Sequence, residues 1–192
     1  MCGIVGYVGH NDCSKVLTSA LSRLEYRGYD SAGIAVFDQG KINLIKAEGR
    51  LRNLEDRMKE QNFPKGIAGI GHTRWATHGK PSDINSHPHV GGEHVTLVHN
   101  GIIENYRELK EMLIAKGREF YSETDTEVIA KLLDFNYEGD PIKAIAKTLS
   151  EVQGSFALGI LFSDIPNVIY AVRRGSPLIV GVKESEGFIA SD

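Results

Sequence analysis

The sequence has little cysteine and no large excess of charge of either sign. Only Cys2 and Cys13 occur among its 192 residues, too few for a disulfide framework, which predicts a reducing, cytoplasmic compartment. The formal net charge of -3 gives no electrostatic reason to expect a nucleic acid or an anionic membrane as partner. The chain also has no signal peptide pattern and no apolar run long enough to span a bilayer.

Apolar periodicity predicts strands and helices of ordinary length within a single domain. We expect strands at residues 4–8, 34–37, 42–45, 67–71, 95–99, 156–162, 168–173, 178–182 and 188–190. We expect helices at 12–24, around 51–58, and at 104–115, 126–135 and 142–149. Helices that cluster between blocks of strands favour an α+β sandwich of antiparallel sheets over a strictly alternating βαβ fold.

The second residue, Cys2, is the first candidate for chemistry. If Met1 is removed, a thiol with a reference pKa of about 8.5 and an α-amine of about 7.7–8.0 belong to one residue. The amine then acts as the base for the thiol, so this nucleophile needs no separate histidine. The plain alternative is a small buried hydrophobic residue near a terminus.

Three polar segments are further candidates, and each alone has a structural explanation. Asn100-Gly101 after an apolar run is a common turn signal, and Asp125 or its neighbour Thr124 is a suitable helix cap. Arg74 fits a surface ion pair equally well. The segments lie at residues 72–79, 99–101 and 122–125.

Histidines offer a second interpretation. His87 and His89 are spaced to share a zinc ion on an extended segment, with His94 and His99 downstream. No carboxylate or cysteine is evidently placed to complete such a set, and there is no His-Glu-x-x-His helix. We therefore expect no metal site.

Together the segments resemble the class II glutamine amidotransferase domain. The resemblance covers nearly the whole chain, in order, through the motifs at residues 1–6, 26–33, 72–79, 99–105 and 122–127. It implies a four-layer αββα sandwich of two antiparallel sheets, of the N-terminal nucleophile hydrolase type. Trp75 and the Ala-Thr-His-Gly that follows it resemble the amino-sugar-forming subfamily, whereas relatives such as amidophosphoribosyltransferase usually carry tyrosine there.

The resemblance implies a catalytic role for three residues. Cys2 attacks the side-chain amide of L-glutamine and forms a thioester, while the Asn100 carboxamide and the Gly101 backbone N–H stabilise the oxyanion. Arg27 has a supporting role, the orientation of Asn100.

The remaining implied roles concern substrate binding. Arg74 holds the α-carboxylate of glutamine and Asp125 its α-ammonium group. Trp75, Thr77 and His78 belong to a mobile loop that closes over the bound substrate. A further interpretation, beside the metal site, is a catalytically silent module that senses glutamine.

The resemblance further implies that residues 1–192 form a glutaminase domain that is truncated at its C-terminal end. No cofactor is expected. Ammonia would pass to a C-terminal sugar-phosphate isomerase region, absent here, that converts fructose 6-phosphate to glucosamine 6-phosphate. The full-length enzyme would be a homodimer through that region, which leaves a monomer for this part alone.

Overall fold

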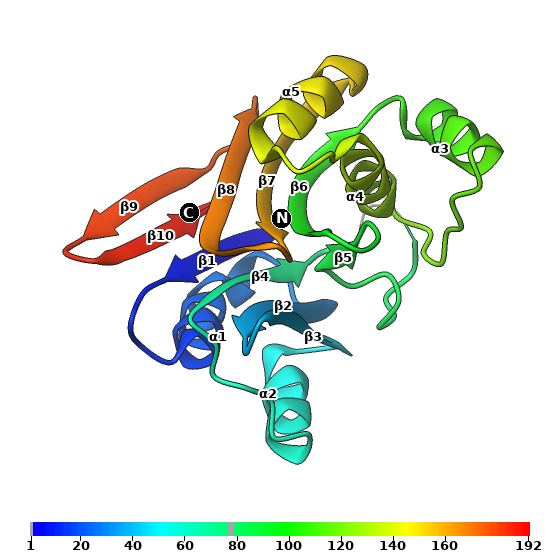
Figure 1. Ribbon diagram of the computed structural model, residues 1–192. Coiled ribbons are helices and arrows are strands. Elements are labelled where there is room, and N and C mark those ends of the chain that lie inside the picture. Colours follow the sequence, from blue (N-terminus) through cyan, green and yellow to red (C-terminus); the bar gives the residue numbers. More distant parts are fainter. Residues whose placement is uncertain (1, 77–78) are drawn as a thin grey trace.

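The computed structural model of the protein describes residues 2–76 and 79–192 and consists of two antiparallel sheets between layers of helices (Figure 1). The larger sheet contains β1 (Gly3–Val8), β2 (Ser31–Asp38), β3 (Lys41–Glu48), β4 (Ala68–Arg74), β9 (Ile179–Lys183) and β10 (Glu186–Ala190), in the order β3-β2-β4-β1-β10-β9. The smaller contains β5 (His89–Val90), β6 (Val95–Ile103), β7 (Gly154–Phe162) and β8 (Ile165–Arg174), in the order β5-β6-β7-β8. Every pairing between these strands is antiparallel.

Helices cover the outer face of each sheet (Figure 1). The six-stranded sheet is covered by α1 (Cys13–Leu24), which continues into the 3-10 turn η1 (Glu25–Arg27), and by α2 (Leu51–Glu60). The four-stranded sheet is covered by α3 (Tyr106–Ala115), α4 (Asp125–Asn136) and α5 (Pro141–Glu151). The predicted α+β class and αββα layering are therefore confirmed.

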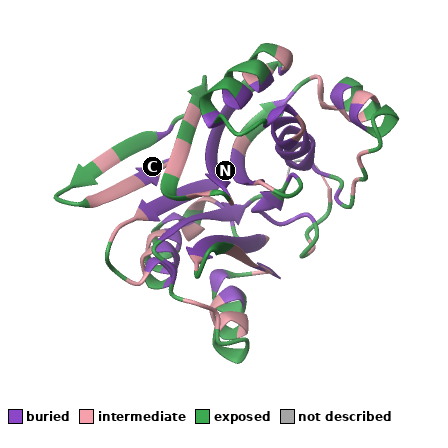
Figure 2. Cartoon of the chain, viewed as in Figure 1, coloured by how far each residue is buried: buried purple, intermediate pink, exposed green. Residues whose placement is uncertain are grey.

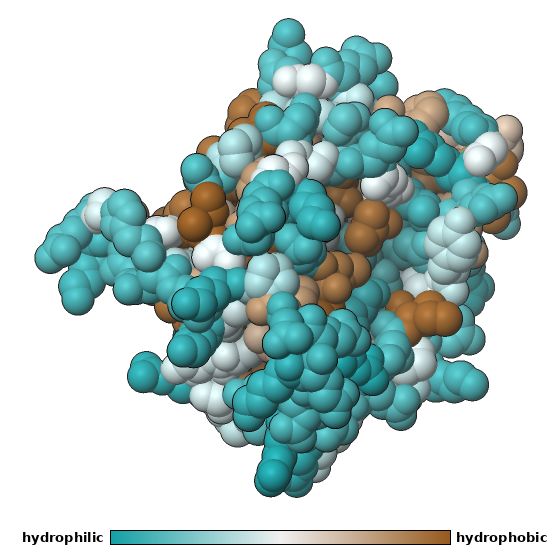
Figure 3. Space-filling view, turned by 60° about the horizontal axis from the view of Figure 1, so that its bottom comes forward, coloured by the Kyte–Doolittle hydropathy of each residue, from teal (hydrophilic) through white to brown (hydrophobic). Residues whose placement is uncertain are grey.

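Buried apolar side chains hold the layers together in three clusters. One lies between α1 and α2 and their sheet, a second between the other helices and the smaller sheet, and a third between the two sheets. Figure 2 shows the corresponding buried strands in the middle of the molecule. The face in Figure 3 is mainly hydrophilic, with apolar residues in small separate patches. Among the described residues, no helix combines the length and the apolar character needed to cross a membrane.

Helix starts follow the capping residues that the sequence offers. The Asp12 carboxylate accepts the Lys15 N–H at the start of α1. Thr124 accepts the Glu127 N–H at the start of α4. The capping role therefore falls to Thr124, which leaves the next side chain, that of Asp125, available for other contacts.

Most strands are somewhat longer than predicted, and the extensions of β4 and β6 carry candidate residues. β4 continues past Gly71 to Arg74, and β6 continues past His99 to Ile103. The prediction ended each strand where the apolar run ended, but backbone pairing continues, with Asn100 opposite Ala157. The interpretation of Asn100-Gly101 as a turn is therefore wrong.

Candidate active site

A cavity of about 410 Å³ opens where the ends of β1, β4 and β6 meet. All the predicted site residues that the structure describes line it: Cys2, Arg27, Arg74, Trp75, Asn100, Gly101 and Asp125. The other wall residues, which sequence reasoning did not assign to the site, are His87, His99, Ile102, Thr124, Thr126, Ser176 and Pro177. The remaining two predicted site residues, Thr77 and His78, lie outside the described residues.

Sheet register accounts for this convergence of residues distant in sequence. Gly3 pairs with Thr73, so Cys2, one residue earlier, reaches the end of β4 that carries Arg74. Asn100 lies on β6 of the facing sheet and contacts Cys2 from there. Its Nδ2 donates to the Cys2 carbonyl at 3.1 Å. The thiol, the guanidinium and the carboxamide therefore share one cavity.

The sulfur of Cys2 is half-buried and lies against the backbone of Trp75. The Trp75 N–H donates to Sγ at 3.2 Å, and the Trp75 carbonyl lies 3.4 Å from the same atom. Burial raises the pKa of the Cys2 thiol, and the Trp75 N–H only partly opposes this effect. The thiol is thus predominantly protonated at neutral pH and requires a base before it can act as a nucleophile.

Asn100 and Gly101 form the wall beside this sulfur. The Asn100 Oδ1 lies 2.9 Å from Nε2 of His72, opposite the Nδ2 that donates to Cys2. Gly101 has a φ of +113°, and a Cβ at this position would lie 2.1 Å from the carbonyl oxygen of Ser155. Only glycine fits both the backbone angle and the space.

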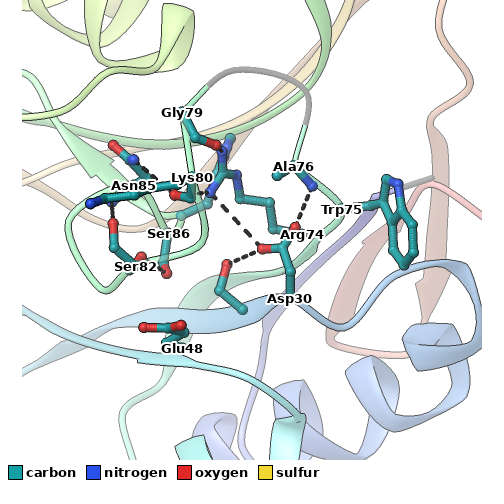
Figure 4. A network of polar contacts seen from close by, with 12 residues as sticks. Asp30, Glu48, Arg74, Trp75, Ala76, Gly79, Lys80, Ser82, Asn85 and Ser86 are labelled. Carbon is teal, nitrogen blue, oxygen red and sulfur yellow. Dashed lines mark hydrogen bonds and ion pairs between the residues drawn. The ribbon is translucent and has the colours of Figure 1, made fainter.

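Arg74 is buried, with a relative exposure of 3%, and belongs to the polar network drawn in Figure 4. Its Nη2 donates to the carbonyl of Gly79 at 2.9 Å, and its Nη1 lies 3.9 Å from the Asp30 carboxylate. The same carboxylate accepts hydrogen bonds from the backbone N–H of Ala76 and from the Ser31 hydroxyl. Asp30 thus fixes the guanidinium together with the backbone that leaves β4.

Asp125, the first residue of α4, lines the same cavity. Its side chain is buried, and its Oδ2 accepts the Ile103 N–H at 2.9 Å. The cavity lining therefore includes both a guanidinium and a carboxylate, which suits a small zwitterion.

Two other predicted residues lie at the cavity edge. The Trp75 side chain is 53% exposed, and its ring meets that of Tyr29 edge-on, with centroids 6.1 Å apart. The Arg27 Nη1 lies 3.4 Å from the Ser191 carbonyl and 3.4 Å from the Asp192 carboxylate. The orientation of Asn100 by Arg27 stays a prediction, whereas His72, which sequence reasoning did not single out, contacts Asn100 directly.

Of the four histidines of the metal interpretation, His87, His89 and His99 are buried near the cavity, whereas the side chain of His94 is half-exposed. His87 stacks on His72 with ring centroids 3.9 Å apart, and its ring is nearly perpendicular to that of His89. The His89 Nε2 contacts the Thr124 hydroxyl at 3.2 Å. In residues 2–76 and 79–192, no three His, Cys, Asp or Glu side chains come together as metal ligands would.

The layered architecture, with a cysteine immediately before the first strand, is that of the N-terminal nucleophile hydrolases. A family model described as "Glutamine amidotransferase domain" matches residues 72–192, and the chain belongs to this family.

Similar proteins agree with this assignment. The chain is 57% identical over 193 residues to the glutamine--fructose-6-phosphate aminotransferase [isomerizing] of Clostridium acetobutylicum, and 53% identical over 194 residues to that of Aquifex aeolicus. Each alignment covers 100% of this chain and 32% of the relative, so the chain spans about a third of these relatives. The structure resembles glutamine phosphoribosylpyrophosphate amidotransferase from Bacillus subtilis, with a TM-score of 0.84, 28% identity and coverage of 99% of this chain and 42% of that one.

Proposed function

We propose that this chain hydrolyses the side-chain amide of L-glutamine, with Cys2 as the nucleophile. The observation that carries the proposal is the convergence of a thiol, a guanidinium, a carboxamide and a carboxylate on one cavity. The family assignment supports glutamine as the substrate. A catalytically silent glutamine sensor would not need a thiol beside an amide donor, and this favours the enzyme.

The reaction proceeds in two steps. After removal of Met1, the α-amine of Cys2 accepts the thiol proton, and Sγ attacks the amide carbon of glutamine. The proton then passes to the leaving nitrogen, and ammonia departs from a glutamyl thioester. Water adds to the thioester, which releases glutamate and restores the thiol. The reaction consumes one water and needs no cofactor.

Asn100 and Gly101 stabilise the tetrahedral intermediate. The Asn100 Nδ2 carries two N–H groups, and one donates to the Cys2 carbonyl. The second N–H of Asn100 and the backbone N–H of Gly101 donate to the oxyanion. Loss of one such donor typically costs about 3–4 kcal/mol in the barrier.

Arg74 and Asp125 select the amino-acid end of the substrate. The planar guanidinium of Arg74 binds the α-carboxylate, and the carboxylate of Asp125 binds the α-ammonium group. Trp75, Thr77 and His78 close over bound glutamine, which keeps water from the thioester until ammonia has left. A primary amide without the zwitterionic end is therefore a poor substrate.

The names of the relatives support the proposal that the released ammonia is used to make an amino sugar. In the whole protein, ammonia converts fructose 6-phosphate to glucosamine 6-phosphate in a C-terminal isomerase region, and the whole protein is a homodimer. The reduced thiol that the reaction needs fits the cytoplasm.

The test is the release of glutamate and ammonia from glutamine by protein that has lost Met1. Cys2→Ala, which removes only the sulfur, is the control. Equal amounts of both products from the parent and none from the variant are expected. Retained hydrolysis by Cys2→Ala would refute the proposal.

A further inference from the structure

His72 lies between the two sheets and contacts Asn100, the candidate oxyanion donor. It is on β4, a strand with neighbours on both sides, and its side chain is completely buried. Its Nε2 lies 2.9 Å from the Asn100 Oδ1 and 3.0 Å from the backbone carbonyl oxygen of His99. One ring nitrogen therefore faces two oxygen atoms of β6.

This geometry fixes the position of the proton on the His72 ring. The His99 carbonyl is an acceptor that cannot exchange roles, so Nε2 carries the hydrogen and donates to it. Because this N–H also faces the Asn100 side chain, the Asn100 atom next to it must be an acceptor, which is Oδ1. Burial lowers the pKa of His72 to about 3, so the ring is neutral and its Nδ1 is unprotonated.

The proton on Nε2 in turn determines which way the Asn100 carboxamide lies. With Oδ1 held by His72, Nδ2 is directed to the Cys2 carbonyl and to the cavity. Rotation of the amide by half a turn would set an N–H against the His72 N–H and an oxygen against the Cys2 carbonyl. It would also present an oxygen, rather than a donor, to the developing oxyanion.

The ring of His72 is also held by His87, which lies in the loop before β5 and is itself bound by β6 and α4. It stacks on His87, with 11° between the ring planes. The His87 Nδ1 accepts the His99 backbone N–H at 3.3 Å, so its proton is on Nε2, which lies 3.4 Å from the Thr126 hydroxyl. The orientation of the His72 ring is thus fixed by its two oxygen partners on β6 and by the stacked ring of His87.

We infer that His72 is a positioning residue: through its Nε2–H it holds the Asn100 carboxamide with the donor side toward the cavity. The effect on catalysis rests on the proposed function, whereas the contact itself does not. His72 does not touch the substrate, and its contribution is to the barrier rather than to binding.

The kinetic test compares His72→Leu with His72→Gln, because the glutamine amide places an N–H close to the position of Nε2. His72→Leu lowers kcat for glutamine by about 10²-fold, the scale of losing one oxyanion donor, with KM nearly unchanged. His72→Gln restores a large part of that loss. Equal losses in the two variants, or a loss confined to KM, would overturn the inference.

A double-mutant cycle separates positioning from general damage. In an Asn100→Ala background the residue to be positioned is gone, so His72→Leu has no further effect on kcat. The same fold-loss in both backgrounds would contradict a role through Asn100.

Neutron diffraction on the unsubstituted protein tests the contact without any activity. The expected result is hydrogen on Nε2 of His72, none on its Nδ1, and the Asn100 nitrogen beside the Cys2 carbonyl. Hydrogen on Nδ1, or a reversed amide, would overturn the inference. If the parent fails to hydrolyse glutamine, the proposed function fails and this measurement still decides the contact.

Discussion

The backbone N–H of Trp75 lies 3.2 Å from the sulfur of Cys2, although 73 residues separate them. β4 ends at Arg74, whose guanidinium we propose binds the substrate, and the next residue contacts Cys2, the proposed nucleophile. A movement of Trp75 therefore changes the hydrogen bond to the Cys2 sulfur directly. This contact links the proposed closing loop to the reacting atom.

Removal of Met1 is required for hydrolysis. While Met1 remains, the Cys2 nitrogen is an amide without a basic lone pair, and the half-buried thiol has no internal base. We expect no turnover by protein that retains Met1 or carries an N-terminal tag. Intact-mass analysis beside a glutaminase assay tests this, and full turnover by unprocessed protein would contradict it.

Asp125→Asn weakens glutamine binding and leaves the fold intact. The amide oxygen of asparagine still accepts the Ile103 N–H, but the charge that pairs with the α-ammonium group is lost. A hydrogen bond between charged groups contributes about 1.5–3 kcal/mol, so KM rises about 10- to 100-fold. Glu138→Gln, an exposed carboxylate outside the cavity lining, is the control. An unchanged KM in Asp125→Asn would contradict the assigned role.

Gly101→Ala destabilises the protein and abolishes hydrolysis. The new Cβ would lie 2.1 Å from the Ser155 carbonyl, in a backbone conformation with φ +113°. Gly117→Ala is a matched control, because Gly117 also has a positive φ but its Cβ meets nothing within 4 Å. We expect a loss of about 1 kcal/mol in the control from the backbone angle alone, and at least about 2 kcal/mol more in Gly101→Ala. Urea denaturation measures both, and equal losses would show that the Ser155 carbonyl moves aside.

Stability falls as the pH drops from neutral toward 5. His72 has a folded-state pKa of about 3 against an ordinary value of 6.5, so the unfolded chain binds the proton first. The loss begins near pH 6.5 and for His72 alone reaches about 2 kcal/mol at pH 5. Buried His87 and His89 shift in the same direction. Urea denaturation at both pH values measures the slope, which His72→Gln reduces. An unchanged slope in that variant would contradict the account.

The order of elements was predictable because strong apolar periodicity and capping residues such as Asp12 mark it locally. The extensions of β4 and β6 were not, because polar residues there remain in the sheet through backbone pairing with distant strands. Cys2, Arg74 and Asn100 could be found from motifs. His72 could not be assigned a role from sequence, since its importance comes from a contact with Asn100 across the two sheets. The signal that could have found it is its place as the first residue of the motif at residues 72–79, two residues before Arg74.

The most direct test of the account is covalent labelling with 6-diazo-5-oxo-L-norleucine, a reactive mimic of glutamine. Processed protein is incubated with the reagent, digested, and the modified residue identified from the peptide mass. The account predicts one label, on Cys2, and protection by excess glutamine. A label on any other residue, or labelling that glutamine does not prevent, would contradict Cys2 as the nucleophile of this cavity.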